Sequence, residues 1–165
     1  EISLGLVGSE MCIRDRTWLN PWWDPGDKGY QIVQSLYAVA SGGLTGLGFG
    51  QSRQKYLYLP EEQNDFIFAI ICEELGLTGA FFLIVIFGLL MWRLMVIALH
   101  CRELQGTLLC VGIMSHMAIQ VILNIAVVTN TIPNTGITLP FISYGGTSVV
   151  FLLGEMGLAL SVSRK

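Results

Sequence analysis

Acidic side chains gather where a polar stretch of this sequence meets an apolar one. Glu61 and Asp65 precede a long apolar run, and Glu73 and Glu74 lie within it. A carboxylate near hydrocarbon is costly, so it is kept when it lines a cavity, pairs with a partner or takes part in chemistry. Asp65 is therefore a candidate general base. A carboxylate at a helix start is also a common cap for free backbone N–H groups, and the residues alone leave both roles open.

A second candidate segment, residues 130–146, is rich in Pro, Gly and Thr and almost free of charge. Irregular backbone at membrane depth must be covered by protein or line a wet cavity. Ser143, Tyr144 and Gly145 offer hydroxyl and amide donors that suit an anion or a sugar. A tight turn that opens the next helix explains the same three residues equally well.

Two further polar residues, His116 and Glu155, lie inside apolar segments. A proton relay is one interpretation. A hydrogen bond to the neighbouring helix is the interpretation that we favour.

The composition limits the class of protein that must position these groups. Of the 165 residues, 53% are hydrophobic and 13% are charged, which is too apolar for an ordinary soluble domain. The net charge of -3 excludes a nucleic-acid partner, because no basic excess is present to neutralise phosphates. The four cysteines have no metal-like spacing, and P-loop, G-x-S-x-G and H-E-x-x-H motifs are missing from the sequence.

Three apolar segments are long enough to span a bilayer, which needs roughly 20 residues per helix. We therefore expect an all-α integral membrane protein with a large structured extracytoplasmic loop. Basic residues after the first and third segments place those ends in the cytoplasm, and both polar loops then face outside. The expected divisions are a non-native leader at 1–16 (an ordinary tail is the alternative), the large outer loop at 17–65, transmembrane helices at 66–99, 106–129 and 147–163, cytoplasmic segments at 100–105 and 164–165, and an outer loop at 130–146.

Two stretches resemble the SEDS family. They are WLNPWWDPGDKGYQIVQSLYAVASGGLTGLGFGQSRQKYLYLPEEQNDFIFAIICEELGLTGA, and NIAVVTNTIPNTGITLPFISYGGTS. Together the resemblance covers about residues 17–165, and it is closer to the FtsW and SpoVE division and sporulation branch than to the RodA branch. It implies a ten-helix protein of which this chain supplies the last three helices and the outer loop before them.

The resemblance also implies a peptidoglycan glycosyltransferase of the bacterial cytoplasmic (inner) membrane, with a site that faces outside. Such an enzyme polymerises lipid II and releases undecaprenyl diphosphate, alongside a class B penicillin-binding protein and other divisome membrane proteins. We expect the isolated chain to be inactive, because a complete cavity needs the other helices. A lipid II flippase and a non-catalytic divisome scaffold are the alternatives.

The family's TDFIFA motif reads NDFIFA here, so the resemblance gives Asp65 the catalytic role. The departures are Asn64 in place of threonine, IPNTG in place of LPVTG, and Glu155 at a position where we expect a neutral residue. The diphosphate charge calls for basic residues or a divalent cation such as Mg or Mn. The candidates for substrate binding are Arg53, Lys55, Glu61, Ser143, Tyr144 and Gly145.

Overall fold

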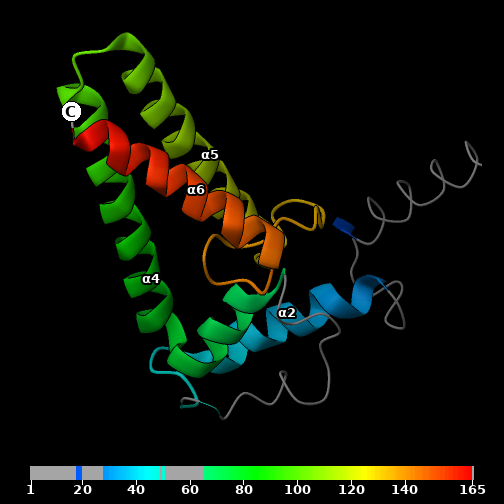
Figure 1. Ribbon diagram of the computed structural model, residues 1–165. Coiled ribbons are helices and arrows are strands. Elements are labelled where there is room, and N and C mark those ends of the chain that lie inside the picture. Colours follow the sequence, from blue (N-terminus) through cyan, green and yellow to red (C-terminus); the bar gives the residue numbers. More distant parts are fainter. Residues whose placement is uncertain (1–17, 20–27, 49, 51–64, 165) are drawn as a thin grey trace, which may run out of the picture.

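The computed structural model describes residues 18–19, 28–48, 50 and 65–164 (Figure 1). Arg53, Lys55, Glu61 and the expected leader at 1–16 lie outside the described residues. Figure 1 shows α4 rising away from α2, α5 returning beside it, and α6 running next to α5. The helices are α2 (Lys28–Gly42), α4 (Ile67–His100), α5 (Leu104–Val128) and α6 (Gly146–Ser163).

Three of these helices, α4, α5 and α6, are long and apolar enough to cross a membrane. They confirm the three apolar helices that the sequence predicts. Large apolar side chains such as Phe81, Leu99 and Phe151 are exposed along them, as lipid or further helices would require.

Helix α4 is broken at Gly76, where the backbone has φ 68° and ψ -168°. In Figure 1 the part before the break lies beside α2, and the longer part after it rises as a separate rod. The sequence predicts one continuous span here, so this break is a feature that the prediction missed. Glu73 and Glu74 consequently belong to the short part next to α2.

The glycine-rich segment after α2 explains why the chain tolerates the break. A broken helix leaves carbonyl and N–H groups without intrahelical partners. The N–H groups of Leu47 and Gly48 donate to the carbonyls of Glu73 and Glu74 at 3.0 and 3.1 Å. In the other direction, the N–H groups that follow Gly76 donate to the carbonyls of residues 43 and 44 at 3.0 and 3.3 Å. These bonds join α2 and α4 into one unit through their backbones.

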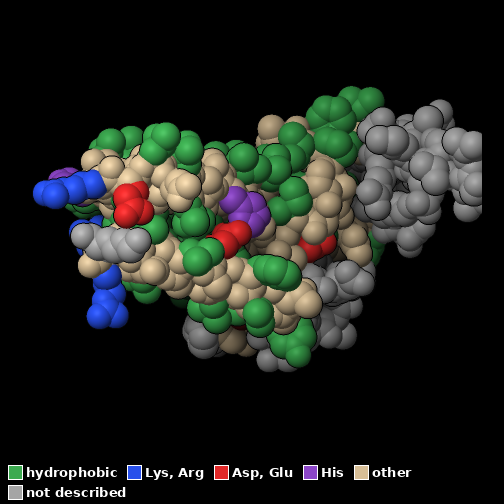
Figure 2. Space-filling view, turned by 45° about the horizontal axis from the view of Figure 1, so that its top comes forward, with side chains coloured by type: hydrophobic (Ala, Val, Ile, Leu, Met, Phe, Trp, Pro, Cys, Tyr) green, Lys and Arg blue, Asp and Glu red, His purple; other side chains and the backbone are tan. Residues whose placement is uncertain are grey.

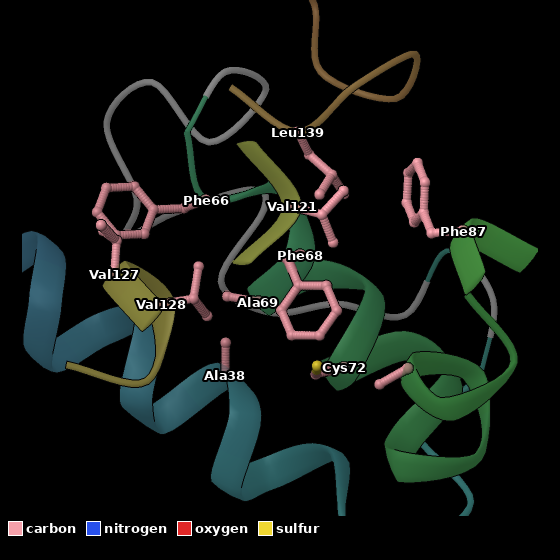
Figure 3. Close-up of a cluster of buried hydrophobic side chains, with 11 residues drawn as sticks. Ala38, Phe66, Phe68, Ala69, Cys72, Phe87, Val121, Val127, Val128 and Leu139 are labelled. Carbon is pink, nitrogen blue, oxygen red and sulfur yellow. The ribbon is translucent and has the colours of Figure 1, made fainter. Parts of the chain in front are cut away.

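A shared hydrophobic core lies where α2, the start of α4, the end of α5 and the second loop meet. Figure 3 shows its side chains pointing toward one another, with Ala38 on α2 and Val127 and Val128 on α5. A second cluster joins the far parts of α4, α5 and α6. The first core therefore positions both polar segments that the sequence singles out. It comprises Ala38, Phe66, Phe68, Ala69, Cys72, Ala80, Phe87, Val121, Val127, Val128 and Leu139.

Candidate functional site

Asp65 lies two residues before the first residue of α4 and is half-buried. The next residue, Phe66, is only 2% exposed and packs in the shared core (Figure 3). A fully buried ring fixes the backbone on either side of it, because interiors are close-packed. The carboxylate of Asp65 is thus presented from a rigid position rather than from a free loop.

Asn124, a buried residue of α5, ties Asp65 to the second loop. Its Nδ2 donates to the backbone carbonyl of Asp65 at 3.0 Å and to that of Ile137 at 2.7 Å. One amide group thereby holds two segments that are 59 and 13 residues away along the chain. This residue is not among those that the sequence alone singles out. The available signal was an amide side chain in the apolar second half of α5, because a buried amide needs a hydrogen-bonding partner.

Gly136 of the second loop faces the Asp65 carboxylate. A Cβ atom built on Gly136 would lie 3.5 Å from Asp65 Oδ2, and the residue has a φ of 69° that favours glycine. Its N–H donates to Asn134 Oδ1 at 3.1 Å. IPNTG departs from LPVTG at two positions, Ile132 and Asn134, and Asn134 supplies a hydrogen bond that valine cannot make. The departure therefore supports the loop where it meets Asp65.

A second bond joins the N-terminal part of the chain to the same loop. Trp18 Nε1 donates to the carbonyl of Asn130 at 3.0 Å, and Asn130 Nδ2 donates back to the carbonyl of Trp18 at 3.4 Å. Asn130 has a φ of 55°, a conformation that asparagine tolerates better than most residues. The prediction that the segments before α4 and after α5 lie at the same end of the helices is confirmed by these contacts.

Ser143, Tyr144 and Gly145 form the turn before α6. Ser143 is buried, and its Oγ accepts a bond from the N–H of Leu139 at 2.8 Å, while its own N–H donates to the Leu139 carbonyl at 3.2 Å. The N–H of Gly145 donates to the carbonyl of Ser143 at 2.9 Å. Tyr144, by contrast, is 80% exposed. The serine shapes the turn, and the tyrosine is the side chain of the three that reaches outward.

The two polar residues inside the spans bond to each other across α5 and α6. His116 Nδ1 donates to the Glu155 carboxylate, at 3.1 Å from Oε1 and 3.2 Å from Oε2. The Nε2 atom of Gln120 donates to the other ring nitrogen of His116 at 3.1 Å. The interpretation as a bond between helices is confirmed. Glu155 therefore has a defined partner although a neutral residue was expected at its position.

The described residues contain no cluster of three or more His, Cys, Asp or Glu side chains that could hold a metal ion on its own. Magnesium does not need such a cluster, because it commonly uses one or two carboxylates together with substrate phosphates. A magnesium ion could therefore be held largely by the phosphate oxygens of a substrate. A cation bound there would neutralise charge on a diphosphate leaving group.

Three helices suited to a bilayer define a multi-pass membrane protein, with Asp65 and Gly136 as a candidate site at one end of the helices. The chain belongs to the FtsW, RodA and SpoVE family of cell cycle proteins, which it matches over residues 6–165.

Individual relatives agree with this family. The chain is 56% identical to stage V sporulation protein E of Bacillus subtilis, with 92% of the chain and 41% of that protein covered. It is 48% identical to the probable peptidoglycan glycosyltransferase FtsW of the same organism, with 87% and 36% covered. A solved chain from work on a peptidoglycan synthase complex that coordinates polymerization and crosslinking is 35% identical, with a TM-score of 0.71 and coverage of 92% and 40%. The chain thus spans well under half the length of these relatives.

Proposed function

We propose that the protein to which this chain contributes is a peptidoglycan glycosyltransferase that polymerises lipid II, with Asp65 as its general base. The observation that carries the proposal is the fixed position of Asp65, whose backbone Asn124 holds and whose carboxylate faces Gly136 of the second loop. The relatives named glycosyltransferase support the reaction class. The role in division or in sporulation follows from the similarity to FtsW and SpoVE.

In the proposed reaction the 4-hydroxyl oxygen of one sugar attacks the anomeric carbon of another. The bond from that carbon to the diphosphate oxygen breaks, and undecaprenyl diphosphate leaves. Asp65 accepts the proton of the attacking hydroxyl, which is a general-base role for a carboxylate. Attack and proton removal take place at one position, so the base must be held in place, as Asn124 and the buried Phe66 hold Asp65.

Other groups would stabilise the leaving diphosphate and orient the sugars. Arg53 and Lys55 carry the charge that suits the diphosphate, and Glu61 would line the cavity from the same loop. Tyr144 is an exposed residue of the second loop and offers a hydroxyl to the sugar, with Ser143 and Gly145 shaping the turn that presents it. Mg or Mn held on the diphosphate would supply further positive charge.

The orientation of the protein follows from its basic end. Arg93, His100 and Arg102 lie at the far end of α4 from Asp65, and such residues collect in cytoplasmic segments. Asp65 would then face outward from the cytoplasmic membrane, where lipid II is used.

Because a relative comes from a complex that polymerises and crosslinks, we expect a class B penicillin-binding protein as partner, together with other divisome membrane proteins.

The test is glycan polymerisation from labelled lipid II by the intact protein with its partner in liposomes. We expect Asp65→Asn, which keeps the shape of the side chain, to lower the rate by a factor of about 100 or more while lipid II binding persists. Glu155→Gln is the matched control, because it removes a carboxylate that is bonded to His116 and lies away from the two loops. Unchanged polymerisation by Asp65→Asn overturns the assignment.

The same variants separate the two alternatives. A lipid II flippase would keep transport in Asp65→Asn unless that residue binds the substrate, and a scaffold would show normal complex formation without dependence of any chemistry on Asp65. Of the three candidate functions, only the glycosyltransferase predicts that Asp65→Asn loses polymerisation and still binds lipid II.

A further inference from the structure

A cavity of about 480 Å³ lies at the end of the helices that is remote from Asp65. The last turns of α4, the connection to α5 and the end of α6 surround it, and none of its lining residues belongs to the proposed catalytic site. The lining consists of Arg93, Val96, Ile97, His100, Cys101, Arg102, Glu103, Gly106, Ser161, Val162 and Ser163.

The wall that α4 contributes is one face of a helix. Arg93, Val96, Ile97 and His100 are spaced i, i+3, i+4 and i+7, which places their side chains on the same side. Two cationic or ionisable groups therefore flank an apolar strip. His100 Nδ1 donates to the carbonyl of Val96 at 2.8 Å, and this bond fixes the orientation of the ring.

Charge in the lining is net positive, since two arginines stand against one glutamate. Figure 2 shows basic side chains gathered at one end of the molecule, with an acidic side chain nearby. A guanidinium binds phosphate through two parallel hydrogen bonds, so Arg93 and Arg102 have the chemistry to hold an anionic phosphate. Ser161 and Ser163 add hydroxyl donors from α6.

Close packing holds α6 in place beside this cavity. A Cβ atom on Gly106 would come within 2.6 Å of Cys101 Sγ and 3.0 Å of Val162 Cγ1, so α5 and α6 approach each other there without space for a side chain. The serines that follow and precede Val162 are consequently positioned by the fold.

The depth of the cavity suits a lipid head group. Residues 75–92 carry no charge, and Arg93 is the first charged residue after them. Arg93 lies about two helical turns before the end of α4 at His100, from where its long side chain can reach the level of phospholipid phosphates. The strip formed by Val96, Ile97 and Val162 provides an apolar surface next to the cations, as the first methylenes of an acyl chain require.

We propose that this cavity binds the phosphate-bearing head group of an anionic phospholipid. Basic pockets between transmembrane helices are known sites for anionic lipids. The inner leaflet as the source of the lipid depends on the orientation proposed above, whereas the phosphate chemistry does not. A free phosphate would satisfy the arginines as well, but it would leave the apolar strip without a partner.

The experiment is native mass spectrometry of the intact protein in detergent with phosphatidylglycerol or phosphatidylcholine added. We expect phosphatidylglycerol to remain bound to the parent and the double variant Arg93→Gln, Arg102→Gln to bind it about tenfold less well. Arg164→Gln is the matched control, because Arg164 is a basic residue near the same end and does not line the cavity. It should bind within about twofold of the parent.

Several outcomes overturn the proposal. Undiminished phosphatidylglycerol binding by the double variant does so, and so does an equal loss in Arg164→Gln, which would indicate a general attraction to the basic surface. Inorganic phosphate that binds as tightly as the lipid would assign the site to a free anion. If the double variant fails to fold, Arg102→Gln alone, a change in the exposed connection between helices, is expected to lower binding about threefold.

Discussion

The two ends of the helices differ in the groups that hold them together and line them. At the Asp65 end, backbone groups bond to one another or to Asn124, and glycines allow segments that are distant in sequence to touch. At the basic end, side chains on one face of α4 and in the following connection surround an open cavity. Substitutions at the first end should therefore affect folding and catalysis together. Charge substitutions at the second end should change lipid binding with little effect on folding.

The largest effect is expected from Gly76→Ala. A positive φ is costly for alanine, and the added methyl group would collide with the backbone of Leu44 and Gly46, so we expect a loss of about 3 kcal/mol or more in the free energy of unfolding. Thermal unfolding followed by fluorescence-detected gel filtration measures it. Gly88→Ala in the same helix, where a Cβ meets open space, should be neutral or slightly stabilising. Equal unfolding temperatures for both variants would contradict the role of the break.

The second largest effect is expected from Asn124→Leu. It removes both bonds that hold Asp65 and Ile137, and we expect about 2 kcal/mol of destabilisation together with a strong loss of lipid II polymerisation. Thr107→Val, which removes one hydrogen bond at the other end of α5, is the comparison. If both variants polymerise equally well, Asn124 does not position the base.

Gly136→Ala is expected to distinguish the effect of backbone strain on stability from the effect of a contact with Asp65 on polymerisation. Both Gly136 and Gly43 have positive φ, so an alanine at either costs about 1–2 kcal/mol. A Cβ atom meets the Asp65 carboxylate only at Gly136, while at Gly43 it meets open space. We therefore expect polymerisation per folded molecule to fall about tenfold in Gly136→Ala alone. Equal activity in the two variants would refute a catalytic contact at Gly136.

The smallest effect on stability is expected from the His116–Glu155 pair, which lies midway between the two ends of the helices. A double-mutant cycle of His116→Ala and Glu155→Gln should give a coupling energy of about 0.6 kcal/mol in unfolding measurements. Ser115→Ala paired with Glu155→Gln should show no coupling, because Ser115 bonds to the carbonyl of Gly112 in its own helix. A coupling near zero for both pairs would mean that the ion pair adds nothing to helix association.

Much of this molecule could be predicted from its sequence, for reasons that differ from residue to residue. Long apolar runs specify α4, α5 and α6, because a bilayer demands them. Asp65 could be singled out by its place before such a run and by its motif. Asn124 could not be assigned a role, since its partners are backbone carbonyls that only the folded chain brings together. The break at Gly76 was equally hidden, because glycine inside an apolar run is compatible with an unbroken span.

The bonds between the glycine-rich segment and the broken part of α4 have a consequence for amide hydrogen exchange. The N–H groups of Leu47 and Gly48 and those of Leu77 and Thr78 all take part in one reciprocal set. Local opening that exposes any of them to solvent must break the others, so the four amides should exchange with deuterium as one cooperative unit. Protection would thus extend into a connecting segment, and its rate would report on how often α4 parts from α2.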